Sequence, residues 1–287
     1  MLLCIITRTL GGTGPDHDAA GPTPLESIPM SDAARQELAE HIAVLLERCR
    51  QGREQITAGG ALRPAFALLA SWQSGRLAWT HSDLLASPRF GPAARFFLSD
   101  LYGDQDYSPR DEGMERVYPV MIRLMPAGAL RSIAMGITMH AITQELDVRM
   151  VEVLFDEMGV TDQLDADLYA EAYRRCNNAA DRARQIRLIS EIGHTLDDVV
   201  HHALIYNMVR LARRPARMAG FGPLHDFIER GFSAFRHLDG ASRFLQTIDR
   251  RETRIMESIL AGRPTATWSP PQGGIVGPLI RPGDRQD

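Results

Sequence analysis

Residues 190–207, SEIGHTLDDVVHHALIYN, bring together side chains that could bind a metal ion. The candidates are two carboxylates and two imidazoles on one side of an expected helix: Glu191, His194, Asp198 and His201. Carboxylate and imidazole at this spacing are the ligands that di-iron sites use in helical bundles. One hypothesis is therefore a metal-dependent, di-iron-like oxygenase or oxidase, with His140 as a further ligand.

Two features of the sequence speak against this metal site. A di-iron site of this kind needs a second Glu-x-x-His and two more glutamates, and the chain has no second Glu-x-x-His. Apolar residues, among them Leu188, Ile192 and Leu196, occupy the opposite side of the helix. An amphipathic helix whose polar side faces water explains the pattern. We therefore expect no metal and no other cofactor.

A second group of polar residues lies in MGITMHAITQELD, residues 135–147, which otherwise predicts a strongly apolar helix. His140, Thr143 and Asp147 fall on one side of that helix, three and four residues apart. Polar groups in apolar surroundings must find hydrogen-bond partners, so we expect a buried network. The alternative is a ligand-binding or catalytic site at the same three residues.

The stretch 94–112, ARFFLSDLYGDQDYSPRDE, predicts a helix, a turn and a second helix. Gly103 suits the end of the first helix, and Ser108 with Pro109 suits the start of the second, with Asp111 reaching back as a cap. The alternative is a calcium loop, for which the acidic and hydroxyl residues have the right spacing: Asp104, Asp106, Ser108, Glu112 and Glu115. Pro109 stands where that loop requires glycine, which favours the capped helix.

The motif FFLSDLY resembles the signature of the uncharacterised bacterial FFLEELY motif proteins, with Ser99 and Asp100 in place of two glutamates. The residues that carry the motif are Phe96, Phe97, Leu98, Leu101 and Tyr102. The flanking THSDLLASPRFGPAARFFLSDLYG and the later RD and ELD are similar in order to that group, over residues 75 to 260. The resemblance implies bacterial origin and assigns no activity.

Two further groups of residues have both a structural and a functional explanation. Four arginines near the end of a long helix could bind a phosphate or an acidic partner, or could simply complement the helix C-terminus: Arg210, Arg213, Arg214 and Arg217. Three phenylalanines at helical spacing are typical of a core more than of a cofactor site: Phe227, Phe232 and Phe235.

Composition excludes several classes of function. The chain has 287 residues and a formal charge of −4. Binding of nucleic acid through its phosphates needs concentrated positive charge, so we expect no nucleic-acid partner. The chain contains no lysine, so lysine Schiff bases, pyridoxal phosphate attachment and the Walker phosphate loop are excluded. Its three cysteines are widely spaced, which fits neither a disulfide framework nor a Cys-x-x-Cys motif. With no long apolar run, we expect a cytoplasmic protein without membrane contact.

The elements that must position these residues are almost all helices, because apolar residues recur at three- and four-residue spacing. We predict an all-α, multi-helix bundle with two long helices, at about 127–158 and 179–213. Residues 1–29 and 263–287, rich in Gly and Pro, are expected to be disordered around a single domain at 30–262. The favoured function is a noncatalytic binding or interaction protein, with an unknown protein partner or self-association.

Overall fold

The computed structural model describes residues 31–58, 61–101, 108–124, 127–201 and 203–269. The segments 1–29 and 270–287, for which we predicted disorder, lie outside the described residues. The described part of the chain is an all-α fold, as predicted. None of its helices is both long enough and apolar enough to cross a bilayer.

The elements follow one another along the chain with short connections. In order they are α2 (Asp32–Ile56), β1 (Thr57–Ala58), β2 (Ala61–Leu62), α3 (Pro64–Thr80), α4 (Ser82–Ala86), α5 (Gly91–Phe96), η1 (Phe97–Leu101), α6 (Ser108–Leu124), α7 (Ala127–Val151), η2 (Glu152–Glu157), α8 (Ala166–Arg175), α9 (Ala179–Val200), α10 (Ala203–Leu211), α11 (Arg213–Met218), α12 (Gly222–Leu238), α13 (Ser242–Leu260) and η3 (Thr265–Thr267). The π-helical segments η1 and η2 continue α5 and α7 without a break. The two short strands pair antiparallel.

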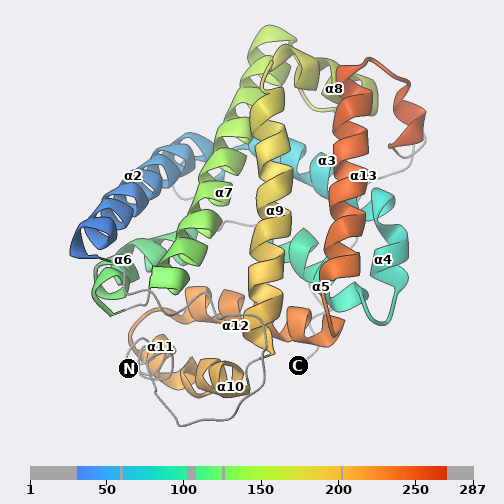
Figure 1. The fold of residues 1–287 in the computed structure, drawn as a ribbon. Coiled ribbons are helices and arrows are strands. Elements are labelled where there is room, and N and C mark those ends of the chain that lie inside the picture. The colour runs from blue at the N-terminus through green and yellow to red at the C-terminus, as the bar shows by residue number, and fades with distance from the viewer. Residues whose placement is uncertain (1–30, 59–60, 102–107, 125–126, 202, 270–287) are drawn as a thin grey trace.

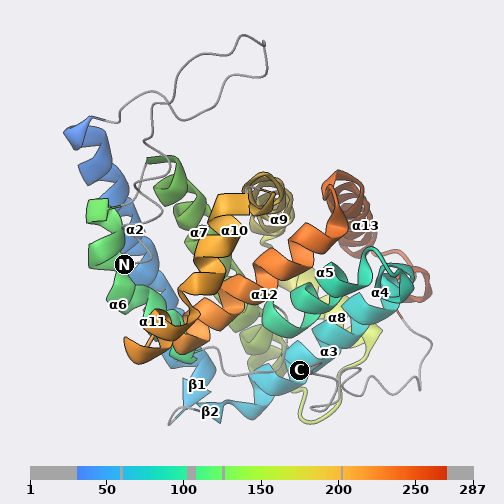
Figure 2. The same ribbon diagram turned by 90° about the horizontal axis from the view of Figure 1, so that it is seen from below.

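Three long helices, α7, α9 and α13, stand side by side and form the centre of the fold (Figure 1). Helix α2 packs along the outer side of α7, and α12 crosses beneath the lower end of α9. Seen from below, α12 runs across the molecule, with α10 and α11 packed against it and α3 and α5 on the other side (Figure 2). This arrangement encloses the inner sides of α3, α7, α9 and α12.

Helix α2 begins where the sequence predicts. Ser31 is its N-cap, and the Ser31 hydroxyl accepts a hydrogen bond of 3.2 Å from the Ala34 backbone N–H. The apolar side of α2 packs on α7, with Ile42 and Leu45 among the most deeply buried residues. Gly52 lets the two helices approach closely, because a Cβ atom there would lie 2.8 Å from the side-chain oxygen of Gln144.

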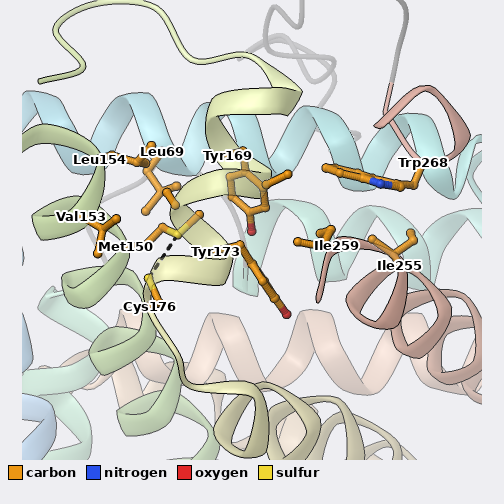
Figure 3. Packing of buried hydrophobic residues seen from close by; sticks show 12 residues of the cluster. Leu69, Met150, Val153, Leu154, Tyr169, Tyr173, Cys176, Ile255, Ile259 and Trp268 are labelled. Carbon is orange, nitrogen blue, oxygen red and sulfur yellow. Dashed lines mark hydrogen bonds between the residues drawn. The ribbon is translucent and has the colours of Figure 1, made fainter. Parts of the chain in front are cut away.

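The packed part of the chain extends beyond the predicted domain end at residue 262. Residues 263–269 are not a disordered tail, since Trp268 is only 2% exposed. Its ring meets Trp72 edge to face at 6.4 Å, and Trp72 stacks on Tyr169 at 4.0 Å. Figure 3 shows the buried cluster to which Tyr169 and Trp268 belong, together with Met150 and Ile259, and Trp72 packs against this cluster. Burial of so large an aromatic ring anchors η3 on α3 and α8.

The prediction of one long helix at 179–213 is wrong, because α9 ends at Val200 and α10 begins at Ala203. At the break, the His201 ring donates to the backbone oxygen of Asp197 at 2.7 Å, so the side chain occupies a carbonyl of the last helical turn. Helix α10 then turns to lie against α12. That turn buries Met208 and Val209, which a straight continuation of α9 would carry away from α12. The other predicted long helix is present as α7 and η2.

Candidate functional site

The four candidate metal ligands of α9 lie on the outside of the protein. Glu191, His194, Asp198 and His201 are all exposed. The ring of His194 donates to the backbone oxygen of Ser190 at 2.8 Å, one turn back in the same helix. The opposite side of α9 faces the interior through its apolar residues, as an amphipathic helix requires. The exposed carboxylates and imidazoles therefore do not converge with His140, which faces inward from α7.

The polar side of α7 lies against α3, α6 and α9. The His140 ring bonds the Asp111 carboxylate at 2.9 Å, and Gln185 donates to the Thr143 hydroxyl at 2.8 Å. Gln73 of α3 donates to Oδ1 of Asp147 at 3.2 Å. Each of the three α7 side chains thus has a partner from a different helix. The Thr143 hydroxyl itself donates to the backbone oxygen of Met139, so it is not a nucleophile bonded to His140.

Asp111 is the charged centre of this network. Its carboxylate binds His140 and, at 3.0 Å, the guanidinium of Arg110. The predicted cap also involves Ser108, whose side chain lies outside the described residues, so the cap stays a prediction. Burial alone raises the pKa of Asp111, but the hydrogen bond from His140 and the charge on Arg110 outweigh it, so the pKa lies below its usual value. Arg110 also covers the ring of Phe227 at 4.9 Å. The pair at Asp111 and His140 thus joins α6, α7 and α12.

This pair forms part of the wall of a large cavity of about 400 Å³, enclosed by α2, α3, α6, α7, α9 and α12. Most of the wall is apolar and aromatic, and Phe97, Phe227 and Phe232 contribute rings to it. Gly136 lies on the wall one turn before His140, and apart from its two chain neighbours and the nearby backbone of α7, a Cβ atom built there meets no described heavy atom within 4 Å. The cavity is therefore open space directly beside the polar network.

A small cavity of about 110 Å³ adjoins the large one, because Gln73, Thr143 and Asp147 line both. Its far wall carries a buried ion pair in which Arg76 bonds Glu252 at 2.7 Å. His81 bonds the same carboxylate at 2.8 Å. Burial alone raises the pKa of Glu252, but the charge on Arg76 and the bond to His81 lower it to about 2. Glu252 is therefore held ionised, and it balances the charge on Arg76.

The FFLSDLY motif has a structural role beside the large cavity. Phe96 packs on Phe227 at 5.6 Å between ring centres, and Asp100 accepts a 2.9 Å bond from Arg230. Both contacts hold α5 and η1 against α12. The side chain of Leu101 and the whole of Tyr102 lie outside the description.

The calcium-loop alternative cannot be followed along its whole length. Asp104 and Asp106 lie outside the described residues. Its last expected ligand, Glu115, instead pairs with Arg53 of α2 at 2.8 Å.

A third group of polar residues, on α12, has the side-chain types of a metal site, but its carboxylates form ion pairs with arginines. His225, Asp226 and Glu229 are the only three potential ligands that come together in the part of the chain that is described. Two of the four predicted basic residues cover their carboxylates: Arg213 bonds Glu229 at 2.7 Å, and Arg217 bonds Asp226 at 3.1 Å. These contacts neutralise both acids, and they also engage two arginines that were candidates for binding a phosphate.

The sequence contained no local signal for several residues of the two cavities. Asp111 stands 29 positions before its partner His140, and Glu252 stands 176 positions after Arg76. Only the packing of the helices brings such pairs together. The FFLSDLY resemblance did single out the RD and ELD segments, whose residues Arg110, Asp111 and Asp147 all line the large cavity.

Comparison with known proteins places this site within a family. The model of a domain of unknown function, DUF8198, matches residues 53–266, which include the walls of both cavities from α3 onwards. No curated protein and no solved structure matches the chain. The match does not bear on the resemblance to the FFLEELY motif proteins, which stays a prediction.

Proposed function

The chain belongs to the DUF8198 family, a domain of unknown function, and we propose that it binds a small, mostly apolar molecule in the large cavity. The observation that carries this proposal is a space of about 400 Å³ with mostly apolar walls and a hydrogen-bonded acid–imidazole pair among its few polar groups. Cavities of about 300–1,000 Å³ with a few converging polar groups are typical of small-molecule sites. The ligand would place its apolar body against the phenylalanine rings, beside the polar part of the wall that Asp111 and His140 form.

Gly136 supports the proposal independently. It lies in the interior of α7, where glycine costs about 0.5–1 kcal/mol of stability relative to alanine. Its conformation does not demand glycine, since its φ is not in the left-handed region, and no neighbouring atom would clash with a Cβ. What the missing side chain does provide is volume in the cavity. A residue that lowers stability and keeps a cavity open is typical of a functional site.

The experiment is a titration with N-phenyl-1-naphthylamine, a neutral apolar dye that fluoresces in apolar surroundings. We expect saturable binding of one dye per chain and displacement by 1-octanol. Gly136→Leu should fill the cavity and lower dye affinity at least tenfold. The control Ala43→Leu adds the same side chain at an exposed position of α2 and should leave affinity unchanged. Dye binding that is absent, or equal in all three proteins, contradicts the proposal.

The oxygenase alternative has little support from the positions of its residues, because its α9 ligands are exposed and point away from His140. A protein partner and self-association stay predictions, as do bacterial origin and a cytoplasmic location. A mass measurement in solution tests self-association. Metal analysis of purified protein tests the oxygenase: two irons or manganese per chain, lost in Glu191→Gln or His194→Ala, would make it the leading interpretation.

A further inference from the structure

Arg182 is a buried cation without an ion-pair partner among the described residues. The residue is only 5% exposed, and its guanidinium lies 4.6 Å from the ring centre of Tyr173. Among the described residues, no carboxylate lies within ion-pair distance of it. Its Nε and Nη2 atoms are sealed from water and have no hydrogen-bond partner there. A buried arginine normally has both, because an unpaired charge in the interior is strongly destabilising.

The position of Arg182 in its helix adds to this cost. It is the fourth residue of α9, near the end where the helix dipole is positive. Positive side chains are unfavourable at that end, and anions are favourable. The stacking on Tyr173 offsets only part of the cost, since a cation–π contact contributes about 2 kcal/mol when desolvated. An anion beside Arg182 would supply the missing ion pair and hydrogen bonds, and it would be favourable at the positive end of the helix.

Arg182 lines the small cavity together with a group that nearly pairs with it. Arg76 and Glu252 on the far wall already neutralise each other, which leaves Arg182 and Asp147. Burial raises the pKa of Asp147, and the charge on Arg182 opposes that rise without overcoming it. Asp147 thus lies near Arg182 without forming an ion pair with it among the described residues. Gln185 and Tyr169 provide further polar atoms around the same space.

We propose that Arg182 binds the carboxylate of a small organic acid, whose apolar body extends from the small cavity into the large one. A carboxylate offers two oxygens to the guanidinium, the bidentate geometry for which arginine is best suited. Gln73, Thr143 and Asp147 line both cavities, so a ligand that occupies both must pass between these side chains. This inference rests on the proposed function and names its ligand class: an amphipathic monocarboxylate.

The test compares octanoate, 1-octanol and octylamine as competitors of the dye at pH 7.5. Octanoate should bind wild-type protein about 10- to 100-fold more tightly than octanol, as hydrogen bonds to a charged group imply. Arg182→Gln should remove this preference and leave octanol affinity unchanged. Arg184→Gln, at an exposed position of the same helix, is the matched control and should keep the preference.

A second variant decides the question if Arg182→Gln does not fold. Asp147→Asn keeps an oxygen to accept the bond from Gln73 and removes the acid that competes with the ligand. It should tighten octanoate binding several-fold and leave octanol unchanged.

The outcomes separate the two proposals. If neither octanol nor octanoate displaces the dye, the proposed function fails. If both bind, three results overturn the assignment of Arg182. They are no preference for octanoate in the wild-type protein, a preference that remains in Arg182→Gln, and a preference that does not increase in Asp147→Asn. A preference for octylamine overturns it in the same way and makes Asp147 the recognition group.

Discussion

Replacing Gly136 should change stability and ligand binding in opposite directions. Gly136→Ala adds a methyl group to open space in the middle of α7, where no described heavy atom other than its chain neighbours and the nearby backbone of α7 lies within 4 Å of it. The gain in helix propensity alone should raise the free energy of unfolding by about 0.5–1 kcal/mol. A methyl group added at a closely packed glycine would lower stability, so an increase here shows that the site has room for the added group.

Gly136→Leu should raise stability further. Burying a leucine side chain contributes about 1.5–3 kcal/mol, and its lost rotamer freedom costs roughly 0.5–1 kcal/mol. Together with the helix propensity, the net gain is about 2 kcal/mol. For a domain of this size, 1 kcal/mol shifts the Tm by about 2–4 °C, so the Tm should rise by roughly 4–8 °C. The same leucine occupies the volume that the dye needs, so affinity should fall.

Gly193 of α9 is the matched comparison, because it lines the same cavity but has no room. A Cβ atom there would lie 2.4 Å from Cδ2 of Leu245, which is itself only 1% exposed. Gly193→Ala should therefore lower the free energy of unfolding, by about 1–3 kcal/mol for overpacking less the gain in helix propensity.

Urea denaturation and thermal melting of the variants, with dye titration of each, measure both effects. A lower Tm for Gly136→Leu would show that the space beside Gly136 is not there. A higher Tm with unchanged dye affinity would show that the cavity exists but is not the binding site.

Three further changes test other parts of the structure. Glu252 has a pKa of about 2 in the fold against an ordinary value of 4.5, so the folded protein holds fewer protons between these values and loses stability as the pH falls from 4.5 towards 2. Glu252→Gln should remove this dependence of stability on acid pH in urea titrations. It should also lower the free energy of unfolding at pH 7 by about 3–5 kcal/mol, because Arg76 is left buried without its partner. An unchanged acid profile would contradict the pairing. Trp268→Ala should cost about 3–5 kcal/mol in the same assay, and a cost below about 1 kcal/mol would mean that η3 does not anchor the end of the fold. Burial raises the pKa of Cys49 to about 12 and also raises that of Cys176. In a Cys4→Ser variant, neither thiol should therefore react with Ellman's reagent at pH 8 until the protein unfolds. Rapid labelling of the native protein would show that these thiols are accessible.

Local periodicity determined the helical class of this protein, because three- and four-residue spacing of apolar side chains is a property of each segment alone. The same reasoning placed His140, Thr143 and Asp147 on one side of α7, and it gave α9 an apolar and a polar side. Ser31 could be recognised as a cap because capping depends only on residues within one turn. These features require no knowledge of which helices meet.

The sequence of a segment alone could not decide where a helix ends when good helix-forming residues continue beyond that point. The pattern continues through His201, yet the helix breaks there because α10 must turn to bury Met208 and Val209 against α12. Trp268 lies in a segment without periodicity, and only the partner ring of Trp72, far away along the chain, makes its burial favourable.

The site was decided almost entirely by tertiary packing. The sequence suggests Asp111 only as a capping residue, and its bond to His140 exists only because α6 lies against α7. Arg182 looks like one of many helical arginines until the helices pack, when it is buried against Tyr173 with two nitrogen atoms that have no hydrogen-bond partner among the described residues. A sequence records the types of such side chains, whereas burial and pairing depend on distances between helices, and these exist only once the helices have packed.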